Sequence, residues 1–247
     1  MQRYSRTGCC AALTALLMQA VMAQDGATIQ PPAFKLTTGL YQYRGGDPQE
    51  GQAVDINLRH SSTAGNVWLG HYVSWAHELT QDRVGWDRTF PAGALRILPS
   101  VQLATGGAWN GSVGVETGQD WYVGAGLGRT NLREAVNLNF DPNDAYSLSG
   151  GYRWQEGTAL GFVLVRDNRL NPDQQHLHLI WRTSLPDAHR LTIDLLLKSG
   201  LVEDEHIERA GLSLAYDWPR WFMRLSYDPK VNFTPQDMWR LSVGTRF

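Results

Sequence analysis

Cysteine is nearly absent from this chain, because its two cysteines, Cys9 and Cys10, both lie within the first 23 residues. Disulfides, zinc–thiolate sites and cysteine nucleophiles are therefore not expected in the rest of the protein. Beyond the first two dozen residues, no apolar run approaches the roughly 18 to 20 residues that a membrane-spanning helix needs. The formal net charge of -2 over 247 residues also excludes a basic nucleic-acid binder.

The N-terminal segment has the features of a secretory signal peptide. Arg3 and Arg6 provide positive charge, residues 9 to 21 are largely apolar, and small residues end the segment at Ala23. We expect cleavage after Ala23, so that residues 1–23 are the signal peptide and residues 24–247 form one exported domain. The cysteines lie too early in the segment to be the acylated cysteine of a lipoprotein.

Alternation of apolar and polar side chains dominates the chain from about residue 34 onward. In one segment, Leu177, Leu179 and Trp181 share a face opposite His176 and His178. Segments of this kind are about ten residues long and are separated by Gly, Pro, Asn and Asp, which is typical of barrel strands. A soluble β-sandwich alternates in the same way, so further features are needed to separate the two folds.

Aromatic residues provide one such feature, because Trp and Tyr gather near the ends of the expected strands. Rings with one apolar and one polar side settle at the headgroup level and form the girdles of membrane barrels. The residues that we assign to these girdles are Trp68, Trp75, Trp109, Trp121, Tyr122, Trp154, Trp181, Trp218, Trp221, Tyr227 and Trp239.

Loop length provides the second feature. The expected short connections, at residues 117–120, 155–157 and 217–219, alternate with expected longer ones at residues 128–144, 167–174, 200–207 and 228–237. Bacterial barrels have short periplasmic turns and longer external loops, so the alternation predicts an even strand number. We count about fourteen strands, or about twelve without two weak segments at 34–43 and 82–90. The sequence leaves open whether the 128–144 loop folds inward as a constriction.

The last ten residues provide the third feature, since Trp239, Leu241 and Val243 are in phase with the terminal Phe247. This segment resembles the final strand of Gram-negative outer-membrane proteins, where a terminal aromatic residue helps the barrel assembly machinery recognise the chain. The three features together predict an all-β, antiparallel transmembrane β-barrel of about 12 to 14 strands with periplasmic termini, and the resemblance agrees with this fold. It also implies an outer-membrane location, contact with outer-membrane lipid and lipopolysaccharide, and an assembly signal that includes Trp239 and Phe247.

One short motif points to catalysis. His60-Ser61-Ser62 resembles the His-x-Ser of outer-membrane phospholipase A and of lipid A deacylases, in which the histidine activates the serine. Thr63 stands where those enzymes have asparagine, and no third residue is placed to orient His60. The segment from Ser62 also has the composition of a hairpin turn on the periplasmic side. We therefore treat His60 and Ser62 as weak catalytic candidates, in an alternative function as an outer-leaflet lipid hydrolase.

No metal or cofactor is predicted. His176 and His178 lie on one face without a third ligand, and the glycine-rich residues 124–128 are not followed by the helix of a dinucleotide site. The acidic clusters at residues 141–144 and 203–205 are expected to be solvated loops.

Alternation also predicts which side chains face the barrel lumen. Arg-rich inward positions favour a narrow porin-like channel for small solutes, anions in particular. The alternative is that arginines and carboxylates pair across the lumen and close it, as in a structural or accessory barrel of an envelope or polysaccharide export system. The candidate lumen residues are Arg59, Arg153, Arg182, Asp194, Lys198, Arg209, Arg224, Asp228 and Arg240, with Arg246, Asp55 and Glu116 on the same face.

Overall fold

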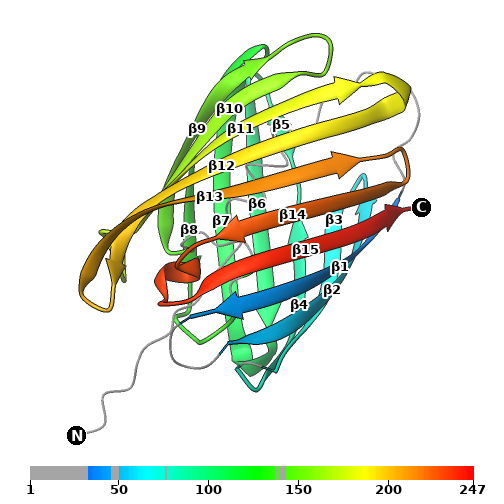
Figure 1. Cartoon of the computed structure of the whole chain (residues 1–247). Helices are drawn as coiled ribbons and strands as arrows, with labels where there is room; N and C mark the ends of the chain where they lie inside the picture. Colours follow the sequence, from blue (N-terminus) through cyan, green and yellow to red (C-terminus); the bar gives the residue numbers. More distant parts are fainter. Residues whose placement is uncertain (1–32, 46–49, 76, 137, 139–142) are drawn as a thin grey trace, which may run out of the picture.

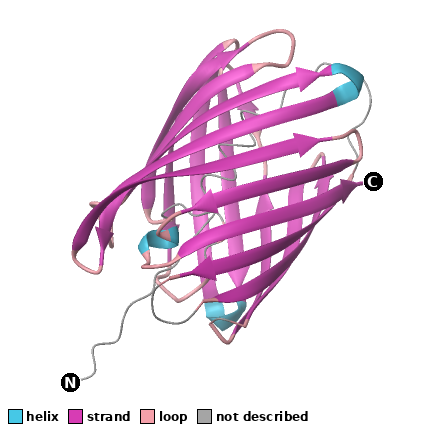
Figure 2. Ribbon diagram, viewed as in Figure 1, coloured by secondary structure: helices cyan, strands magenta, loops and turns pink. Residues whose placement is uncertain are grey.

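The computed structural model describes residues 33–45, 50–75, 77–136, 138 and 143–247, so the predicted signal peptide lies outside the described residues. The described chain is all-β and forms a closed antiparallel barrel of fourteen strands, as predicted (Figures 1 and 2). The strands are β1 (Phe34–Arg44), β2 (Gly51–Ser62), β3 (Gly65–Ser74), β4 (Leu79–Asp87), β5 (Phe90–Ala92), β6 (Leu95–Ala104), β7 (Ala108–Gly118), β8 (Trp121–Thr130), β9 (Ala145–Arg153), β10 (Ala159–Asp167), β11 (Gln175–Leu185), β12 (His189–Val202), β13 (Glu205–Asp217), β14 (Trp221–Asp228) and β15 (Asp237–Arg246). Three short 3-10 turns, at Thr105–Gly107, Pro186–Ala188 and Val231–Phe233, complete the elements.

Closure of the barrel joins the first and last strands. β1 pairs with β15 along its whole length, and Leu40 lies opposite Leu241. β4 and the short β5 both pair with β6 and together make one wall strand, which is why fifteen labelled strands form a fourteen-stranded barrel. The two weak segments of the sequence are genuine strands, β1 and β4. The upper count from the sequence is therefore the correct one.

The two ends of the barrel differ. Phe34 and Phe247 exchange backbone hydrogen bonds of 2.9 and 3.0 Å at one rim, which we call the terminal end. The opposite rim, which we call the loop end, carries the β8–β9, β10–β11 and β14–β15 loops.

One predicted long loop, at 200–207, is wrong. β12 and β13 continue to Val202 and Glu205, and only Glu203 and Asp204 connect them, with φ of 49° and 72°. The hairpin extends past the neighbouring strands at the loop end (Figure 1).

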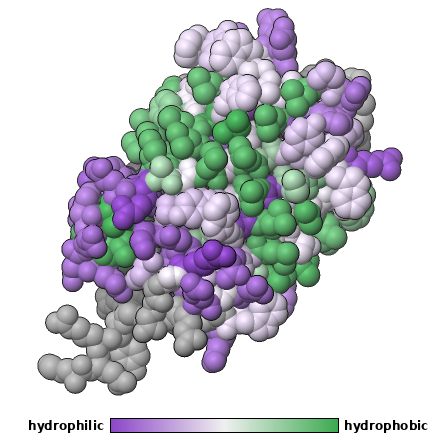
Figure 3. All heavy atoms as spheres, viewed as in Figure 1, coloured by the Kyte–Doolittle hydropathy of each residue, from purple (hydrophilic) through white to green (hydrophobic). Residues whose placement is uncertain are grey.

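The outer face of the barrel is apolar. Outward side chains such as Leu40, Leu69 and Val123 are 52%, 57% and 50% exposed, which in water would be costly over a whole wall. Figure 3 shows hydrophobic residues gathered over the middle of the visible wall and hydrophilic ones toward its lower left end. An apolar band around the barrel is the surface that lipid covers. Within the described residues, no helix is long and apolar enough to cross a membrane.

Aromatic side chains border this band at both ends. Trp121 and Trp221 are 75% and 60% exposed near the terminal end, and Trp75 is 63% exposed at the loop end. Two of the predicted girdle residues are wrong, because they point inward. Trp68 packs in the lumen beside Arg59, with 5.2 Å from the guanidinium carbon to the ring, and Tyr122 is only 5% exposed on the inner wall. Both are near strand ends, but they have the parity of the inner face.

Candidate channel lumen

The inner wall carries the charged residues that alternation predicts. The structure places the nine candidate lumen residues at inward positions of their strands: Arg59, Arg153, Arg182, Asp194, Lys198, Arg209, Arg224, Asp228 and Arg240. Arg209 differs from the others, because β13 pairs with β14 only from Leu212 onward. The Arg209 side chain is therefore exposed on the projecting part of the hairpin, and its Nη1 donates to the Glu208 carbonyl at 2.9 Å.

Positive charge is concentrated in the half of the inner wall nearer the terminal end. Almost the whole circumference contributes, since basic residues come from nine different strands. These inward residues are Lys35, Arg59, Arg83, Arg96, Arg153, Arg182, Arg190, Arg224 and Arg246, whereas the inward carboxylates from the same half to mid-barrel are Asp55, Asp87, Glu116, Asp194 and Asp217. Nine cations against five carboxylates leave a net positive inner surface, although the chain as a whole is acidic.

The ion pairs of this region run along the wall. Arg59 of β2 pairs with Asp87 of β4, and Arg246 of β15 pairs with Asp217 of β13. In each case the partner lies two strands away, on the same part of the wall. The expectation that arginines and carboxylates pair across the lumen is therefore not met by these pairs. Because these ion pairs lie against the wall, they do not block the axis of the barrel.

Glu116 is the centre of the largest of these clusters. One of its oxygens, Oε1, accepts hydrogen bonds from both Arg96 and Arg153, the latter at 2.8 Å. The Arg153 guanidinium also stacks on the Tyr122 ring, with 3.7 Å from Cζ to the ring centroid. Two cations share a single carboxylate here, so the cluster keeps a net positive charge.

Glycines shape the wall on which this cluster lies. The Tyr122 hydroxyl lies so close to Gly151 and Gly161 that added Cβ atoms would come within 2.7 and 2.2 Å of it. A side chain at either position would push the ring off the wall. The glycines of β8 and its neighbours therefore allow Tyr122 to lie flat, rather than form a phosphate loop, and residues 124–128 lie within β8.

Two inward cations of this half lack a carboxylate partner in the described chain. Lys35 lies over the Phe222 ring at 4.5 Å, and Arg224 points inward with an exposed side chain. An inward side chain can be exposed only to solvent inside the barrel, so the lumen is solvent-accessible beside Arg224. Arg240 and Asp217 lie within its electrostatic reach.

The described part of the loop between β8 and β9 reaches into the lumen at Val136 and Leu138. Leu138 is 4% exposed and packs with Tyr41, Tyr43 and Tyr72 of the opposite wall, and the Arg240 guanidinium donates to its carbonyl at 3.2 Å. The sequence left open whether this loop constricts the barrel, and the position of Leu138 shows that the described part of the loop does so.

A second pair of hydrogen bonds fixes the same loop to β4. The Val136 N–H donates to Gln81 Oε1 at 2.7 Å, and Gln81 Nε2 donates to the Val136 carbonyl at 3.4 Å. A cavity of about 20 Å³ beside Asn110, Val136 and Asn143 is roughly the space for one water molecule. The constriction is thus fixed on several sides.

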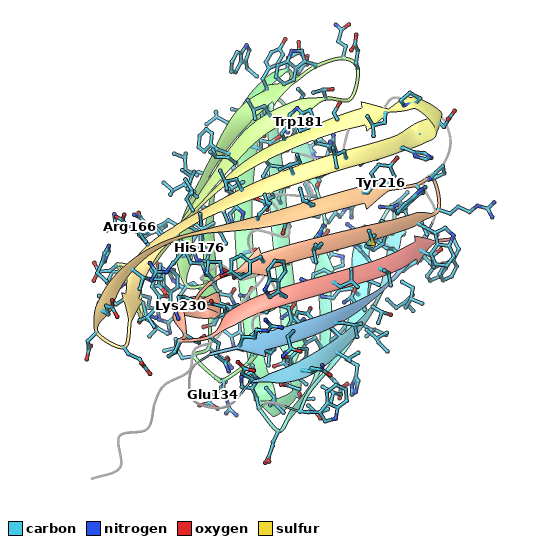
Figure 4. The ribbon with its side chains drawn as sticks, viewed as in Figure 1. Glu134, Arg166, His176, Trp181, Tyr216 and Lys230 are labelled. Atoms are coloured by element: carbon cyan, nitrogen blue, oxygen red, sulfur yellow. The ribbon has the colours of Figure 1, made fainter. Side chains whose placement is uncertain are left out.

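A second loop, between β14 and β15, covers another part of the loop end. Its Phe233 ring stacks on His176 with ring centroids 5.1 Å apart, and its Lys230 carbonyl accepts a hydrogen bond from Lys198 Nζ at 3.1 Å. Figure 4 shows His176 and Lys230 at this end. Lys198 also forms a buried ion pair with Asp228 at 2.5 Å. Lys198 and Asp228 therefore support this loop rather than line an open pore.

His176 and His178 contact other side chains of the barrel. His178 Nδ1 lies 2.9 Å from Asp194 Oδ1, and His176 lies against Phe233. Within the described residues, no group of three or more His, Cys, Asp or Glu side chains could hold a metal ion. Asp144, expected in a solvated loop, is instead buried and is bound by Arg169 at 2.9 Å, and its neighbours 141 and 142 lie outside the described residues.

His60 and Ser62 both lie at outward positions of β2, close to the terminal end. The His60 ring lies 4.7 Å from the Phe34 ring, whereas the Ser62 hydroxyl donates to the Gly65 carbonyl at 3.1 Å and accepts from the Ala64 N–H at 3.2 Å. The serine hydroxyl thus caps the turn, as its sequence context indicates, and no hydrogen bond to His60 is formed in the described structure.

Several lumen residues are missing from the sequence-based set. Lys35 lies on a segment that the sequence marks as a weak strand, although its parity with Tyr41 would place it inward. Arg83, which pairs with Asp55, lies on the other weak segment. Alternation carried through both segments would have found them.

Comparison with known proteins supports the fold. No protein-family model matches the chain. The outer membrane protein Omp33 of Acinetobacter baumannii superposes with a TM-score of 0.57 at 12% identity, covering 88% of this chain and 99% of Omp33. The KdgM porin gives a TM-score of 0.48 at 13% identity, covering 85% and 99% of the two chains.

One curated sequence also matches over a short region. An insoluble isoenzyme of beta-fructofuranosidase from Arabidopsis thaliana is 33% identical over 88 residues, which are 34% of this chain. The match spans only 14% of that enzyme. It therefore shows no family. The barrel closure, the inward polar wall and the likeness to Omp33 together show that the chain has the porin-like β-barrel fold of Gram-negative outer-membrane proteins.

Proposed function

We propose that this protein is a narrow outer-membrane channel for small anionic solutes. The observation that carries the proposal is the excess of inward cations near the terminal end, where Lys35 and Arg224 have no carboxylate partner in the described chain. A row of basic groups around a water-filled passage attracts anions and repels cations. Guanidinium groups dominate the ring, and they bind carboxylates and phosphates through paired donors.

The expected size of this preference follows from Coulomb's law. A unit charge about 8 Å from the path of an ion in water contributes about 0.5 kcal/mol, or roughly a twofold change in local ion concentration. Two unpaired cations therefore favour monovalent anions over cations by roughly an order of magnitude, because attraction and repulsion multiply. Salt weakens the effect, since the Debye length is about 10 Å at 0.1 M.

The inward loop favours a small solute, because it takes up space in the lumen. A barrel of fourteen strands lies between the side-chain-filled barrels of about eight strands and the open channels of about sixteen. The packing of Leu138 against tyrosines of the opposite wall takes up part of that intermediate space. Large solutes would meet this constriction before they reach the cationic ring.

Location and assembly belong to the same proposal. We place the barrel in the outer membrane with the terminal end toward the periplasm, after export through the signal peptide 1–23. Trp239 and Phe247 would then present the assembly signal, and the outer face would contact lipid and lipopolysaccharide. Membrane fractionation locates the protein, and N-terminal sequencing of the mature chain should begin at Gln24.

Recording from the refolded barrel in planar bilayers tests the channel directly. We expect discrete conductance steps and, in a KCl gradient, a reversal potential displaced toward that of chloride. Cation selectivity would overturn the anion proposal while leaving the channel intact. Complete absence of conductance across several lipid compositions and voltages would reject the channel.

A structural or accessory barrel of an envelope export system is the second candidate function. The two loops that fold into the loop end favour it, because they reduce the opening that a solute could use. A barrel that is folded and fails to conduct, and whose deletion impairs surface polysaccharide export, would support this function. An intact export phenotype together with conductance would reject it. The lipid hydrolase is not proposed, since the Ser62 hydroxyl is engaged in its own turn.

A further inference from the structure

A groove crosses the lipid-facing side of the barrel where it closes. It lies over β1, β2 and β15 in their halves nearer the loop end, with a volume of about 240 Å³. Leu40 and Val54 lie opposite each other at its apolar part, and Trp75 and Trp239 contribute an indole from either side. Small-molecule sites usually start at roughly 300 Å³, so this groove suits one chain of a larger molecule rather than a whole compact ligand.

Polarity changes in order along the outward face of β1. Leu40 is apolar, Gln42 carries an amide, and Arg44 carries a charge, each two residues further toward the loop end. These side chains share a face, because strand side chains alternate with a period of two. Their spacing of about 7 Å per step is the scale over which a membrane lipid changes from acyl chain to carbonyl linkage to phosphate. The gradient therefore matches the order of groups in a lipid molecule.

The amide level of the groove has polar groups facing lipid. Gln52 Nε2 donates to Gln42 Oε1 at 3.2 Å, and Gln42 Nε2 donates to the Gly51 carbonyl at 3.3 Å. The pair is thus held in place across two strands. The indole N–H groups of Trp75 and Trp239 have no hydrogen-bond acceptor in the described structure, and Trp75 is 63% exposed. Indole and amide donors at the headgroup level suit the carbonyl oxygens of acyl linkages.

The charged level has an unpaired cation. Arg44 is exposed and forms no ion pair with any residue that the structure describes. Asp237 lies opposite it on β15 but accepts hydrogen bonds from the Lys230 N–H at 3.0 Å and from the Tyr227 hydroxyl at 3.4 Å. Lys230 Nζ lies 3.8 Å from the same carboxylate. Glu50, which precedes β2 at the same rim, is exposed and forms no ion pair with Arg44 in the described structure. The Arg44 guanidinium is therefore open to a ligand at the rim above the groove.

We infer that this groove is a binding site for one phosphorylated acyl lipid of the outer leaflet, the lipid A part of lipopolysaccharide. One acyl chain would lie between Trp75 and Trp239, its amide or ester linkage would face Gln42 and Gln52, and a phosphate would bind Arg44. The inference needs the barrel to be in the outer membrane, but it does not need the lumen to conduct.

Native mass spectrometry of the detergent-purified barrel, with added lipid A, tests the site. We expect one lipid A molecule to remain bound at activation energies that remove further copies. Dephosphorylated lipid A should be retained less. Arg44→Gln should lower retention of lipid A by about threefold to tenfold, as expected for one exposed charge-assisted contact. Arg166→Gln is the matched control, because Arg166 is also an exposed outward arginine near the loop end, on β10.

A second variant tests the groove itself. Leu40→Trp fills the groove with a side chain that is stable at a lipid-facing position, so the barrel should fold and should lose the retained lipid while keeping Arg44. Equal retention by the wild type, Arg44→Gln and Arg166→Gln would overturn the phosphate contact. Retention that survives Leu40→Trp would show that the lipid binds elsewhere. Neither result depends on conductance, so failure here is separable from failure of the channel proposal.

Discussion

Arg240 on the last strand donates a hydrogen bond of 3.2 Å to the carbonyl of Leu138, which lies 102 residues earlier in the chain. This contact joins Leu138 of the inward loop to the wall opposite the strands that the loop connects. The Arg240 guanidinium also lies over the Tyr41 ring at 5.0 Å, so the same side chain packs on the tyrosine cluster that receives Leu138. Arg240 is thus one of the residues that hold the constriction, together with Gln81, which binds Val136 of the same loop.

Replacement of Arg240 should widen and loosen the channel. Arg240→Ala removes the hydrogen bond to the loop and the packing on Tyr41, so we expect a larger single-channel conductance with more frequent current fluctuations. Planar bilayer recording measures both. Arg246→Ala is the matched control, since it removes an inward arginine from the same strand at the terminal end, far from the loop. If both variants change conductance alike, the effect is one of charge and the constriction is not held by Arg240.

Neutralisation of the two unpaired cations should reduce anion selectivity. Each of Lys35→Gln and Arg224→Gln removes a charge that contributes about 0.5 kcal/mol at 8 Å, so each should lower the chloride-to-potassium permeability ratio by a factor of roughly two to six. The double variant should lower it by the product. Reversal potentials in a KCl gradient measure the ratio. Arg166→Gln, which removes an outward charge, should leave the ratio unchanged.

The buried pair of Lys198 and Asp228 should carry more stability than an exposed pair. Lys198→Met removes the cation that lies 2.5 Å from the Asp228 carboxylate, which is 2% exposed, and breaking a buried ion pair by removing one partner costs about 3 to 5 kcal/mol. Lys230→Met breaks the longer contact between Lys230 and Asp237, whose two side chains are 28% and 36% exposed, respectively. The loss of this exposed pair should lower the free energy of unfolding by at most about 1 kcal/mol.

Thermal unfolding in detergent, followed by the shift in electrophoretic mobility of the folded barrel, compares these two variants. Lys198→Met combined with Asp228→Leu should recover most of the loss, because neither partner is then left charged and buried. Equal melting temperatures for Lys198→Met and Lys230→Met would contradict this account.

Once the aromatic residues, the loop lengths and the terminal strand indicate a barrel, alternation predicts which side chains face the lumen, since a strand between lipid and lumen must place its side chains on opposite sides. The inward parity of Arg153, Arg182 and Asp194 followed from it. The same alternation, applied to strand ends, would have separated Trp68 and Tyr122 from the lipid-facing girdles. Residue type alone does not separate them, because an aromatic ring also packs well on a glycine-rich inner wall.

The loops could not be predicted in the same way. The turn at Glu203 and Asp204 uses two left-handed residues, of which only Asp204 is of a type that favours turns, so the turn signal in the sequence is weak there. The inward fold of the β8–β9 loop depends on contacts with Gln81 and Arg240, which are distant in the sequence. Such contacts leave no periodic pattern, and they are what set the opening of the lumen.

Gly161 should tolerate substitution much less than Gly114, although both are inward glycines of the wall. A Cβ at Gly161 would lie 2.2 Å from the Tyr122 hydroxyl, whereas a Cβ at Gly114 would have its nearest contact at 3.7 Å, with Leu98. Gly161→Ala must therefore displace Tyr122, at a cost of about 1 to 3 kcal/mol for overpacking. Gly114→Ala should be neutral or stabilise by up to about 1 kcal/mol, because glycine weakens a strand interior.

Thermal unfolding of the two variants in detergent measures this difference, and removal of the clashing ring tests its cause. Tyr122→Ala in the Gly161→Ala background should abolish the additional cost of the alanine at position 161. Displacement of Tyr122 also moves the support of Arg153, which stacks on its ring at 3.7 Å, so Gly161→Ala should lower anion selectivity while Gly114→Ala does not. A Gly161→Ala barrel with wild-type stability and selectivity would show that the ring shifts freely and that the glycine has no role in placing the arginine.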